Sequence, residues 1–255
     1  MLDDQMMAAN LFTGLTLQQT MWCAMHQDYS SHYVWDDVVA GKVPSDEKAG
    51  EIVEKALLKG GKGHFGPLEH GGITISCGYM PHSVMQQLRT HRIGISFDTQ
   101  SFRFTSQGLI DAYEDFAEAT SDRDKQSALE RVFYFRPVGD YQDRELNKYH
   151  YSESDRHDDL TVAADLLGRY HHRVKHRGFA PEHCRGMLPF ELRQHFVVSF
   201  NARSLMHLAD LRMKPDAQLE AQKAVHLIWS AAHPAAPQVF SWYDDKRKHK
   251  ALLSP

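Results

Sequence analysis

The chain has 255 residues, of which 42% are hydrophobic and 11% aromatic, and these values predict a globular protein with a packed core and a single domain over residues 1–255. The formal net charge of −4 and the pI of about 6.5 argue against a general nucleic-acid binder, which carries a basic face and a high pI. No apolar run approaches the roughly 18 residues of a membrane-spanning helix, so we expect no association with a membrane.

The first part of the chain predicts two helices and one strand. The first clear helix is expected to begin at Pro44-Ser45, where Ser45 can cap it, and to stop at Gly60-Gly61. The alternation over Ile73–Ser76 predicts a strand, and Pro81 suits the first turn of a helix. The segment Ser96–Phe104 has no helical stripe, so we expect loop and extended chain there.

The middle of the chain is polar, with one long helix. A polar stretch over Glu114–Ser127 precedes a second strand candidate at Val132–Phe135. Tyr141–Asp155 is expected to be a surface excursion. Apolar residues at spacings of three and four predict a long helix over about Asp158–His176, ended by a glycine.

The last part alternates between helix and strand. Ala180-Pro181 starts a short helix, and the alternating apolar residues in Phe190–Phe200 predict a strand. Asn201 can cap the helix that follows. Pro215-Asp216 begins a last long helix with a regular apolar stripe. Because there is no regular βαβ order and no GxGxxG turn, we predict a mixed α/β (α+β) domain with a mixed or antiparallel sheet and several long helices, not a Rossmann fold.

The cysteines and the acidic start of the chain bear on its location. Cys23, Cys77 and Cys184 cannot form a CxxC pair, and such a sparse, odd count fits unpaired thiols in a reducing compartment. The start, Met1-Leu2-Asp3-Asp4, is followed by no long apolar segment, so we expect no secretory signal and a cytoplasmic location.

The densest functional cluster joins Arg89-Thr90-His91-Arg92 to the segment Ser96–Phe104. Arginine forks and hydroxyl groups suit the binding of a phosphate. A solvated basic face is the alternative interpretation. The interleaved Phe97, Phe102 and Phe104 favour partial burial, and buried arginines require anionic partners.

Two further clusters are weaker. Arg203 and Arg212 lie nine positions apart on one predicted helix, about two and a half turns, so they point in nearly opposite directions. The segment His64–His70 invites a metal site, but its spacing is not HExxH and no third ligand stands out. Glu69 is equally well explained as a structural carboxylate that bonds the backbone or a neighbouring arginine.

Together the clusters resemble the family of flavin-dependent thymidylate synthases. That family is marked by a His-x-x-Pro-aromatic-Glu-His element, by an Arg-His-Arg run followed by Ser-x-Arg-aromatic, and by an Asn-Ala-Arg-Ser-Leu helix near the end. The chain carries the corresponding residues in the family's order, over about Met21–Trp229. They are His64, Pro67-Leu68-Glu69-His70, Thr90-His91-Arg92, Ser101-Phe102-Arg103-Phe104, Asn201–Leu205, Leu211-Arg212 and Ala217-Gln218.

Several departures indicate a divergent branch of this family. Arg89-Thr90 stands before His91 where the family has a single arginine, and one extra residue lies among Ile93, Gly94 and Ile95. The other departures are Gly66, Leu68, Asp98-Thr99, Phe104 and His207.

The resemblance implies methylation of dUMP to dTMP with bound FAD, with methylenetetrahydrofolate as carbon donor and NADPH as reductant. It also implies a homotetramer with active sites formed between subunits, and no metal. Arg212 is implied to be catalytic, beside the uracil ring. The implied dUMP contacts are Gln87, Arg89, Gln100, Ser101, Arg103, Arg185 and Arg212, and the implied FAD contacts are Glu69, His91, Arg92, Asn201, Arg203, His207 and Gln218.

Three alternatives remain open from the sequence. A non-catalytic nucleotide- or RNA-binding protein would use the same arginines and bind polyanions in a salt-dependent way. A metallohydrolase built around His64, Glu69 and His70 would lose activity with a chelator. A family member that binds FAD but has lost synthase activity would share every motif.

Overall fold

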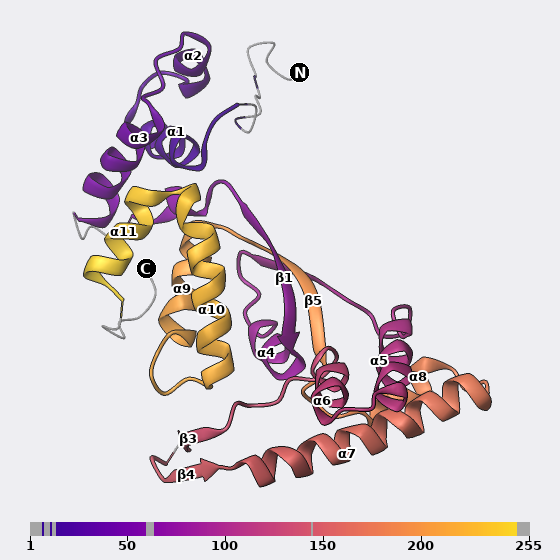
Figure 1. Cartoon of the computed structure of the whole chain (residues 1–255). Coiled ribbons are helices and arrows are strands. Elements are labelled where there is room, and N and C mark those ends of the chain that lie inside the picture. The colour runs from indigo at the N-terminus through magenta and orange to yellow at the C-terminus, as the bar shows by residue number, and fades with distance from the viewer. Residues whose placement is uncertain (1–6, 8–10, 12–13, 60–63, 144, 249–255) are drawn as a thin grey trace. The chain divides into compact units, whose positions relative to one another are not determined.

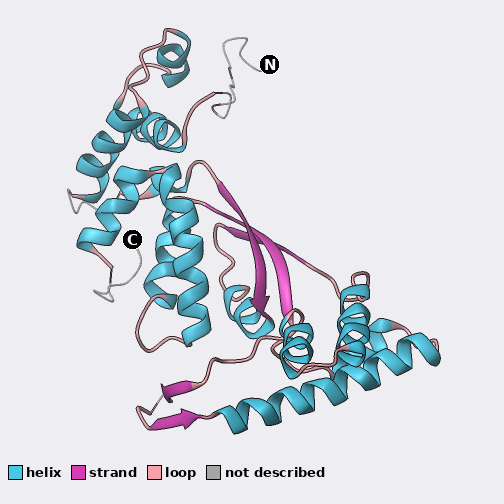
Figure 2. Cartoon of the chain, viewed as in Figure 1, coloured by secondary structure: helices cyan, strands magenta, loops and turns pink. Residues whose placement is uncertain are grey.

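The computed structural model describes residues 7, 11, 14–59, 64–143 and 145–248, and helices dominate it (Figures 1 and 2). The chain divides into two compact units. Unit 1 comprises Met1–Ile75, His91–Ser96 and Val198–Pro255, and unit 2 comprises Ser76–Thr90 and Phe97–Val197. Helices and small sheets together confirm the predicted mixed α/β class.

The main sheet has three strands, β1 (Ile73–Pro81), β2 (Ile95–Thr99) and β5 (Arg193–Phe200), in the order β1-β5-β2. Thr74 Oγ1 lies 2.9 Å from Ser199 Oγ, and the Tyr79 N–H donates to His195 Nδ1 at 3.1 Å. Residue numbers rise along β1 as they fall along β5, so this pair is antiparallel. The strands predicted at Ile73–Ser76 and within Phe190–Phe200 are therefore confirmed.

Unit 1 holds helices from both ends of the chain. They are α1 (Leu17–Tyr29), α2 (Val34–Val39), α3 (Asp46–Val53), α9 (Ala202–Arg212), α10 (Leu219–Ala232) and α11 (Pro237–Lys246). Helix α3 packs against α1 and α11, and α9 packs against α10 (Figure 1).

Two capping predictions in unit 1 are confirmed. The Ser45 hydroxyl accepts from the Lys48 N–H, and the Asn201 side chain accepts from the Ser204 N–H. The predicted stop at Gly60-Gly61 lies outside the described residues. The helix predicted at Pro44-Ser45 is confirmed as α3, but α1 and α2 precede it. The predicted last long helix is confirmed as α10, although it begins at Leu219 and the shorter α11 follows it.

Unit 2 holds α4 (His82–Leu88), α5 (Gln107–Glu118), α6 (Asp122–Glu130), α7 (Glu153–His171) and α8 (Pro181–Cys184). Leu109, Leu129 and Leu167 meet in its core. The stretch expected to be merely polar is helical in α5 and α6. Helix α7 begins at Glu153, earlier than predicted, because Ser152 and Asp155 form a capping box.

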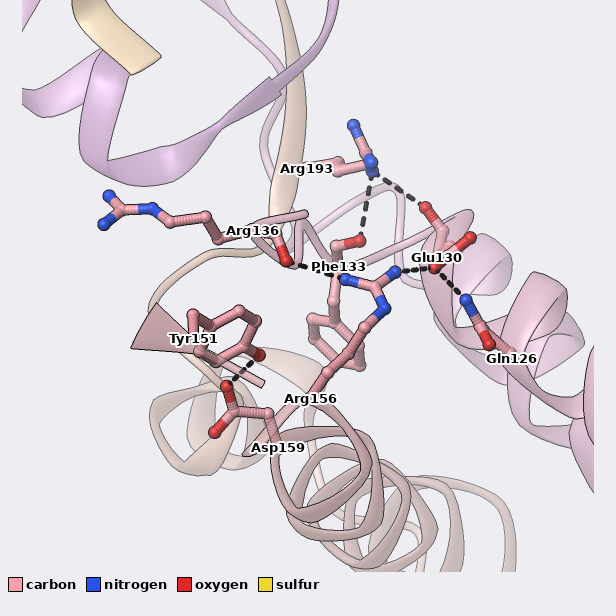
Figure 3. A network of polar contacts seen from close by, with 8 residues as sticks. All are labelled: Gln126, Glu130, Phe133, Arg136, Tyr151, Arg156, Asp159 and Arg193. Atoms are coloured by element: carbon pink, nitrogen blue, oxygen red, sulfur yellow. Dashed lines mark hydrogen bonds and ion pairs between the residues drawn. The ribbon is translucent and has the colours of Figure 1, made fainter. Parts of the chain in front are cut away.

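The strand predicted at Val132–Phe135 is wrong. Phe133 forms one isolated bridge to Leu192, while the Arg193 Nε donates to the carbonyls of Glu130 (2.8 Å) and Phe133 (3.1 Å). Arg156 in turn binds the Glu130 carboxylate (Figure 3). Val132 and Tyr134 do bond the backbone of Arg193 and Glu191. The Phe133 carbonyl instead accepts from the Arg193 side chain, so the pairing does not extend into a strand.

The predicted surface excursion at Tyr141–Asp155 contains a hairpin. Strands β3 (Gly139–Gln142) and β4 (Lys148–Tyr151) pair antiparallel, with Asp140 opposite His150. On the other face of this ribbon Tyr141 stacks on Tyr149, with ring centroids 5.8 Å apart. Each strand has only 4 residues, the lower limit of the alternation that marks a strand in a sequence.

Candidate functional site

Helix α9 and its N-cap carry four of the predicted site residues in unit 1, namely Asn201, Arg203, His207 and Arg212. Asn201 caps it, with its Oδ1 2.8 Å from the Ser204 N–H. The carbonyl of Gly94 accepts from the Asn201 N–H at 3.3 Å, which brings the segment after His91 against the start of the helix. Arg203 lies in the first turn and Arg212 at the last residue of α9.

Arg212 and His91 form the central contact of unit 1. The Nε–H of Arg212 donates to Nε2 of His91 at 3.1 Å. The His207 ring meets the His91 ring edge to face, with centroids 6.0 Å apart. Burial, together with the charges of Arg212 and His207, lowers the pKa of His91 to about 4. His91 is therefore neutral at pH 7, and its proton resides on Nδ1.

Arg203 has a different kind of partner. Its Nη1 lies 2.5 Å from Glu69 Oε1, and Glu69 ends the short 3₁₀ turn Gly66–Glu69. Both side chains are partly exposed, at 37% for the arginine and 50% for the glutamate. Glu69 thus bonds a neighbouring arginine, which is one of the two interpretations that the sequence left open.

The remaining predicted cofactor contacts in unit 1, Arg92, His207 and Gln218, differ in exposure. Arg92 is exposed and Gln218 is partly buried. The Gln218 amide donates to Glu220 at 3.0 Å at the start of α10. Nδ1 of His207 is buried and has no hydrogen-bond partner among the described residues, so α9 presents one unsatisfied polar atom beside His91.

A second group of predicted residues lines a cavity of about 630 Å³ in unit 2. Four predicted dUMP contacts, Arg89, Gln100, Ser101 and Arg185, share this cavity with an aromatic wall. Arg89 follows the end of α4, and Arg185 follows the end of α8. Both arginines are exposed, so their guanidinium groups are accessible to an anion that enters the cavity.

Three predicted dUMP contacts lie outside the residues that line this cavity, namely Gln87, Arg103 and Arg212. Gln87 belongs to α4. Arg103 is 60% exposed, with its Nε 3.3 Å from Glu182, and its guanidinium lies 5.3 Å from the Phe104 ring. Phe102 is buried, but Phe104 is 79% exposed. The expectation of partial burial is therefore wrong for Phe104, and Arg103 is held at the surface by a carboxylate.

The sequence did not indicate two further residues of the unit 2 cavity, His82 and Gln194. Nδ1 of His82 lies 2.6 Å from the Gln194 Oε1, and Nε2 lies 2.7 Å from the Gln86 amide. The ring of Phe190 stands edge-on to His82, with centroids 5.1 Å apart. No spacing signal marks these residues, because His82 begins α4 and Gln194 lies on β5, so they meet only in the folded chain.

Two residues of the alternative metal site, His64 and Glu69, have other partners in the structure. His64 bonds Asp28 at 2.8 Å, and Glu69 bonds Arg203. Within the described part of the chain, no three His, Cys, Asp or Glu side chains gather closely enough to hold a metal ion. The three cysteines are buried and unpaired, and burial raises the pKa of Cys77 to about 11. None of the described helices is long and apolar enough to cross a membrane.

Comparison with known proteins gives a match over most of the chain. Residues 12–238 match the family model described as thymidylate synthase complementing protein. The flavin-dependent thymidylate synthase of Halobacterium salinarum is 30% identical over 259 residues, covering 89% of this chain and 91% of that protein. The enzyme of the same name from Haloarcula marismortui is 29% identical over 201 residues, covering 76% of each chain.

Solved structures share the fold. Thymidylate Synthase X from Helicobacter pylori, with FAD and dUMP, matches with a TM-score of 0.64 at 17% identity, covering 88% of this chain and 92% of that one. A UMP/dUMP methylase from Streptomyces cacaoi, bound with 5-Br UMP, matches with a TM-score of 0.60 at 18% identity, covering 85% and 88%. At these identities the likeness shows the fold alone.

Proposed function

The chain belongs to the family of flavin-dependent thymidylate synthases, and from this premise we propose that it converts dUMP to dTMP by reductive methylation with FAD as cofactor. The observation that carries the proposal is the unit 2 cavity, where four residues proposed for dUMP come together from separate parts of the chain.

The cavity suits a nucleoside monophosphate. Arg89 and Arg185 supply two planar cations for a phosphate, and the Ser101 hydroxyl adds a neutral donor. Aromatic side chains such as Phe97 offer flat apolar surface to a pyrimidine ring. Gln87, Arg103 and Arg212 complete the proposed set, and Arg103 would exchange its bond with Glu182 for the ligand.

FAD fits the residues around α9. Its pyrophosphate requires cations and N–H donors, which Arg92, Arg203 and the first turn of α9 can supply. The unsatisfied His207 Nδ1 is a further polar group for a ligand. Asn201, Gln218, His91 and Glu69 complete the proposed set. When bound and reduced by NADPH, FAD would supply the hydride of the reaction, and methylenetetrahydrofolate would supply the carbon.

Arg212 is the proposed catalytic residue. A guanidinium beside the pyrimidine stabilises the negative charge that develops on the ring as C5 becomes nucleophilic. The thiols are not suited to a nucleophilic role, because they are buried and burial raises the pKa of both Cys23 and Cys77. The protein therefore acts by orientation and electrostatics, while the cofactor carries the redox chemistry.

We also propose that the chain is one functional domain that works in the cytoplasm as a homotetramer, with active sites completed between subunits. Size-exclusion chromatography with light scattering would test the tetramer.

The first experiment is a visible absorption spectrum of the purified protein with FAD and then with dUMP. A flavin spectrum that shifts on addition of dUMP supports one site for both ligands, and dTMP formation then tests turnover. Arg212→Ala should abolish dTMP formation, by at least about 10²-fold, while FAD remains bound. Near-normal turnover in this variant would refute the role of Arg212, and a protein that takes up no FAD would refute the proposal itself.

A further inference from the structure

Two arginines of α9 are held in different ways, and the difference matters for Arg212. Arg203 is held by the carboxylate of Glu69 at 2.5 Å. Arg212 is held through Nε by Nε2 of His91 at 3.1 Å, and the described residues offer its two Nη groups no hydrogen bond or ion pair. One guanidinium is thus paired with a negative charge, and the other is tethered by a neutral ring.

We propose that His91 is the positioning residue for Arg212, fixing its guanidinium through Nε so that both Nη groups and the full positive charge remain available to the pyrimidine. The inference rests on the proposed function, in which Arg212 stabilises charge on that ring. It adds a second task for His91, which the family resemblance places only at the flavin.

The chemistry of the tether explains why a histidine is suitable. A carboxylate would form a stronger bond with an arginine, but it would also cancel most of the charge that the reaction needs. A neutral imidazole accepts one hydrogen bond and leaves the cation uncompensated. The ring is kept neutral by its partial burial and by the two groups that face it, the Arg212 cation and the His207 ring.

The His91 ring is itself held in place. His207, one turn and a half before Arg212 on α9, packs edge to face against His91 at 6.0 Å. The chain after His91 is held against the start of α9 through the Gly94 carbonyl. His91 therefore presents Nε2 from a fixed position, and a fixed acceptor reduces the number of Arg212 rotamers before substrate arrives.

Three substitutions of His91 test separately whether Arg212 needs a hydrogen-bond acceptor, whether that acceptor must be neutral, and whether it must hold the guanidinium in place. His91→Leu removes the acceptor, His91→Asn keeps a neutral acceptor, and His91→Asp provides a charged one. His157→Leu, at an exposed position on α7 in unit 2, serves as the control. Each protein is compared by kcat and KM for dUMP, by bound FAD from its absorbance, and by solvent exchange of the Arg212 Nε–H in ¹⁵N-arginine-labelled, ligand-free protein.

The expected pattern is specific to a positioning role. His91→Leu should lose protection of the Arg212 Nε–H and lose about 10²-fold in kcat, with KM for dUMP changed less than about threefold. His91→Asn should recover most of kcat. His91→Asp should keep the Nε–H protected and still lose at least about tenfold in kcat, because the carboxylate neutralises the cation.

Two results would overturn the inference. One is a His91→Leu protein with unchanged Nε–H exchange or with kcat near wild type. The other is equal kcat for His91→Asn and His91→Asp, which decides the matter even if the leucine variant fails to fold. Failure of the proposed function would look different, since the wild type would then make no dTMP while the exchange measurement still reported the tether.

Discussion

Gly94 stands where the extra residue of the divergent signature was expected, and its replacement by alanine should destabilise the start of α9. Gly94 has a φ of +66°, and a Cβ there would lie 2.2 Å from Ser204 Oγ and 2.5 Å from Asn201 Nδ2. The left-handed backbone alone costs about 1–2 kcal/mol for a residue with a Cβ. Displacing the Asn201 amide also breaks the helix cap, which is worth about 1 kcal/mol. We expect a total loss of about 2–3 kcal/mol.

A matched control isolates the steric part of this loss. Gly41 has a φ of +67° and nothing within 4 Å of its Cβ position. Gly41→Ala should therefore lose only the free energy of placing a Cβ in the left-handed backbone region. Urea unfolding of both variants and the wild type, at one protein concentration, gives the difference. The same measurement in an Asn201→Gly background, where the amide is gone, should reduce the Gly94→Ala effect. Equal losses for Gly94→Ala and Gly41→Ala would refute the reasoning.

Three further predictions follow from contacts elsewhere in the chain. The buried Arg247 has its Nη2 2.8 Å from Asp210 Oδ2, and Asp210→Ala removes this carboxylate. The variant should lose about 3–5 kcal/mol of unfolding free energy, measured with urea. Breaking the exposed pair Lys48–Glu51 should cost far less. Because the pKa of His91 is lowered to about 4 in the folded protein, the unfolded chain binds more protons between pH 4 and 6.5. Stability should therefore fall as the pH falls through this window, by at most about 1.4 kcal/mol per unit, and a wild type with the same pH dependence as His91→Asn would contradict this. Arg185→Ala should weaken dUMP binding, measured by calorimetry, more than flavin binding, and an unchanged dUMP affinity would remove Arg185 from the site.

Short-range signals predicted the elements that depend on them. The sequence predicts the helix caps at Ser45 and Asn201 and the alternation in β5, because each of these patterns spans only a few residues. Helix α1 was missed because its buried face includes Gln18, which is 0% exposed. The Gln18 amide bonds Asp46 and accepts from the Gln238 N–H, so its partners lie 28 and 220 residues away. A polar residue buried by distant partners leaves no local pattern.

The contacts within the site could likewise not be predicted from local sequence patterns. The motifs named Glu69, His91, Arg203 and Arg212 as candidates, and the structure brings them together as two pairs whose members lie 134 and 121 residues apart. The aromatic residues around Arg103 suggested burial, yet its side chain is at the surface beside Glu182. Residue type and order indicate which side chains belong to the site. They do not indicate which of these side chains contact one another, because the contacts form only in the tertiary structure.

The pairing of the two α9 arginines nonetheless has a physical reason that begins in the sequence. Nine positions at about 100° per residue place Arg203 and Arg212 on opposite sides of the helix, so one partner cannot serve both. Arg203 lies in the first turn, where the helix dipole disfavours a cation, and it is paired with the Glu69 carboxylate. Arg212 lies in the last turn, where the dipole favours a cation. It therefore needs no carboxylate, and a neutral acceptor such as His91 is enough to hold it with its charge intact.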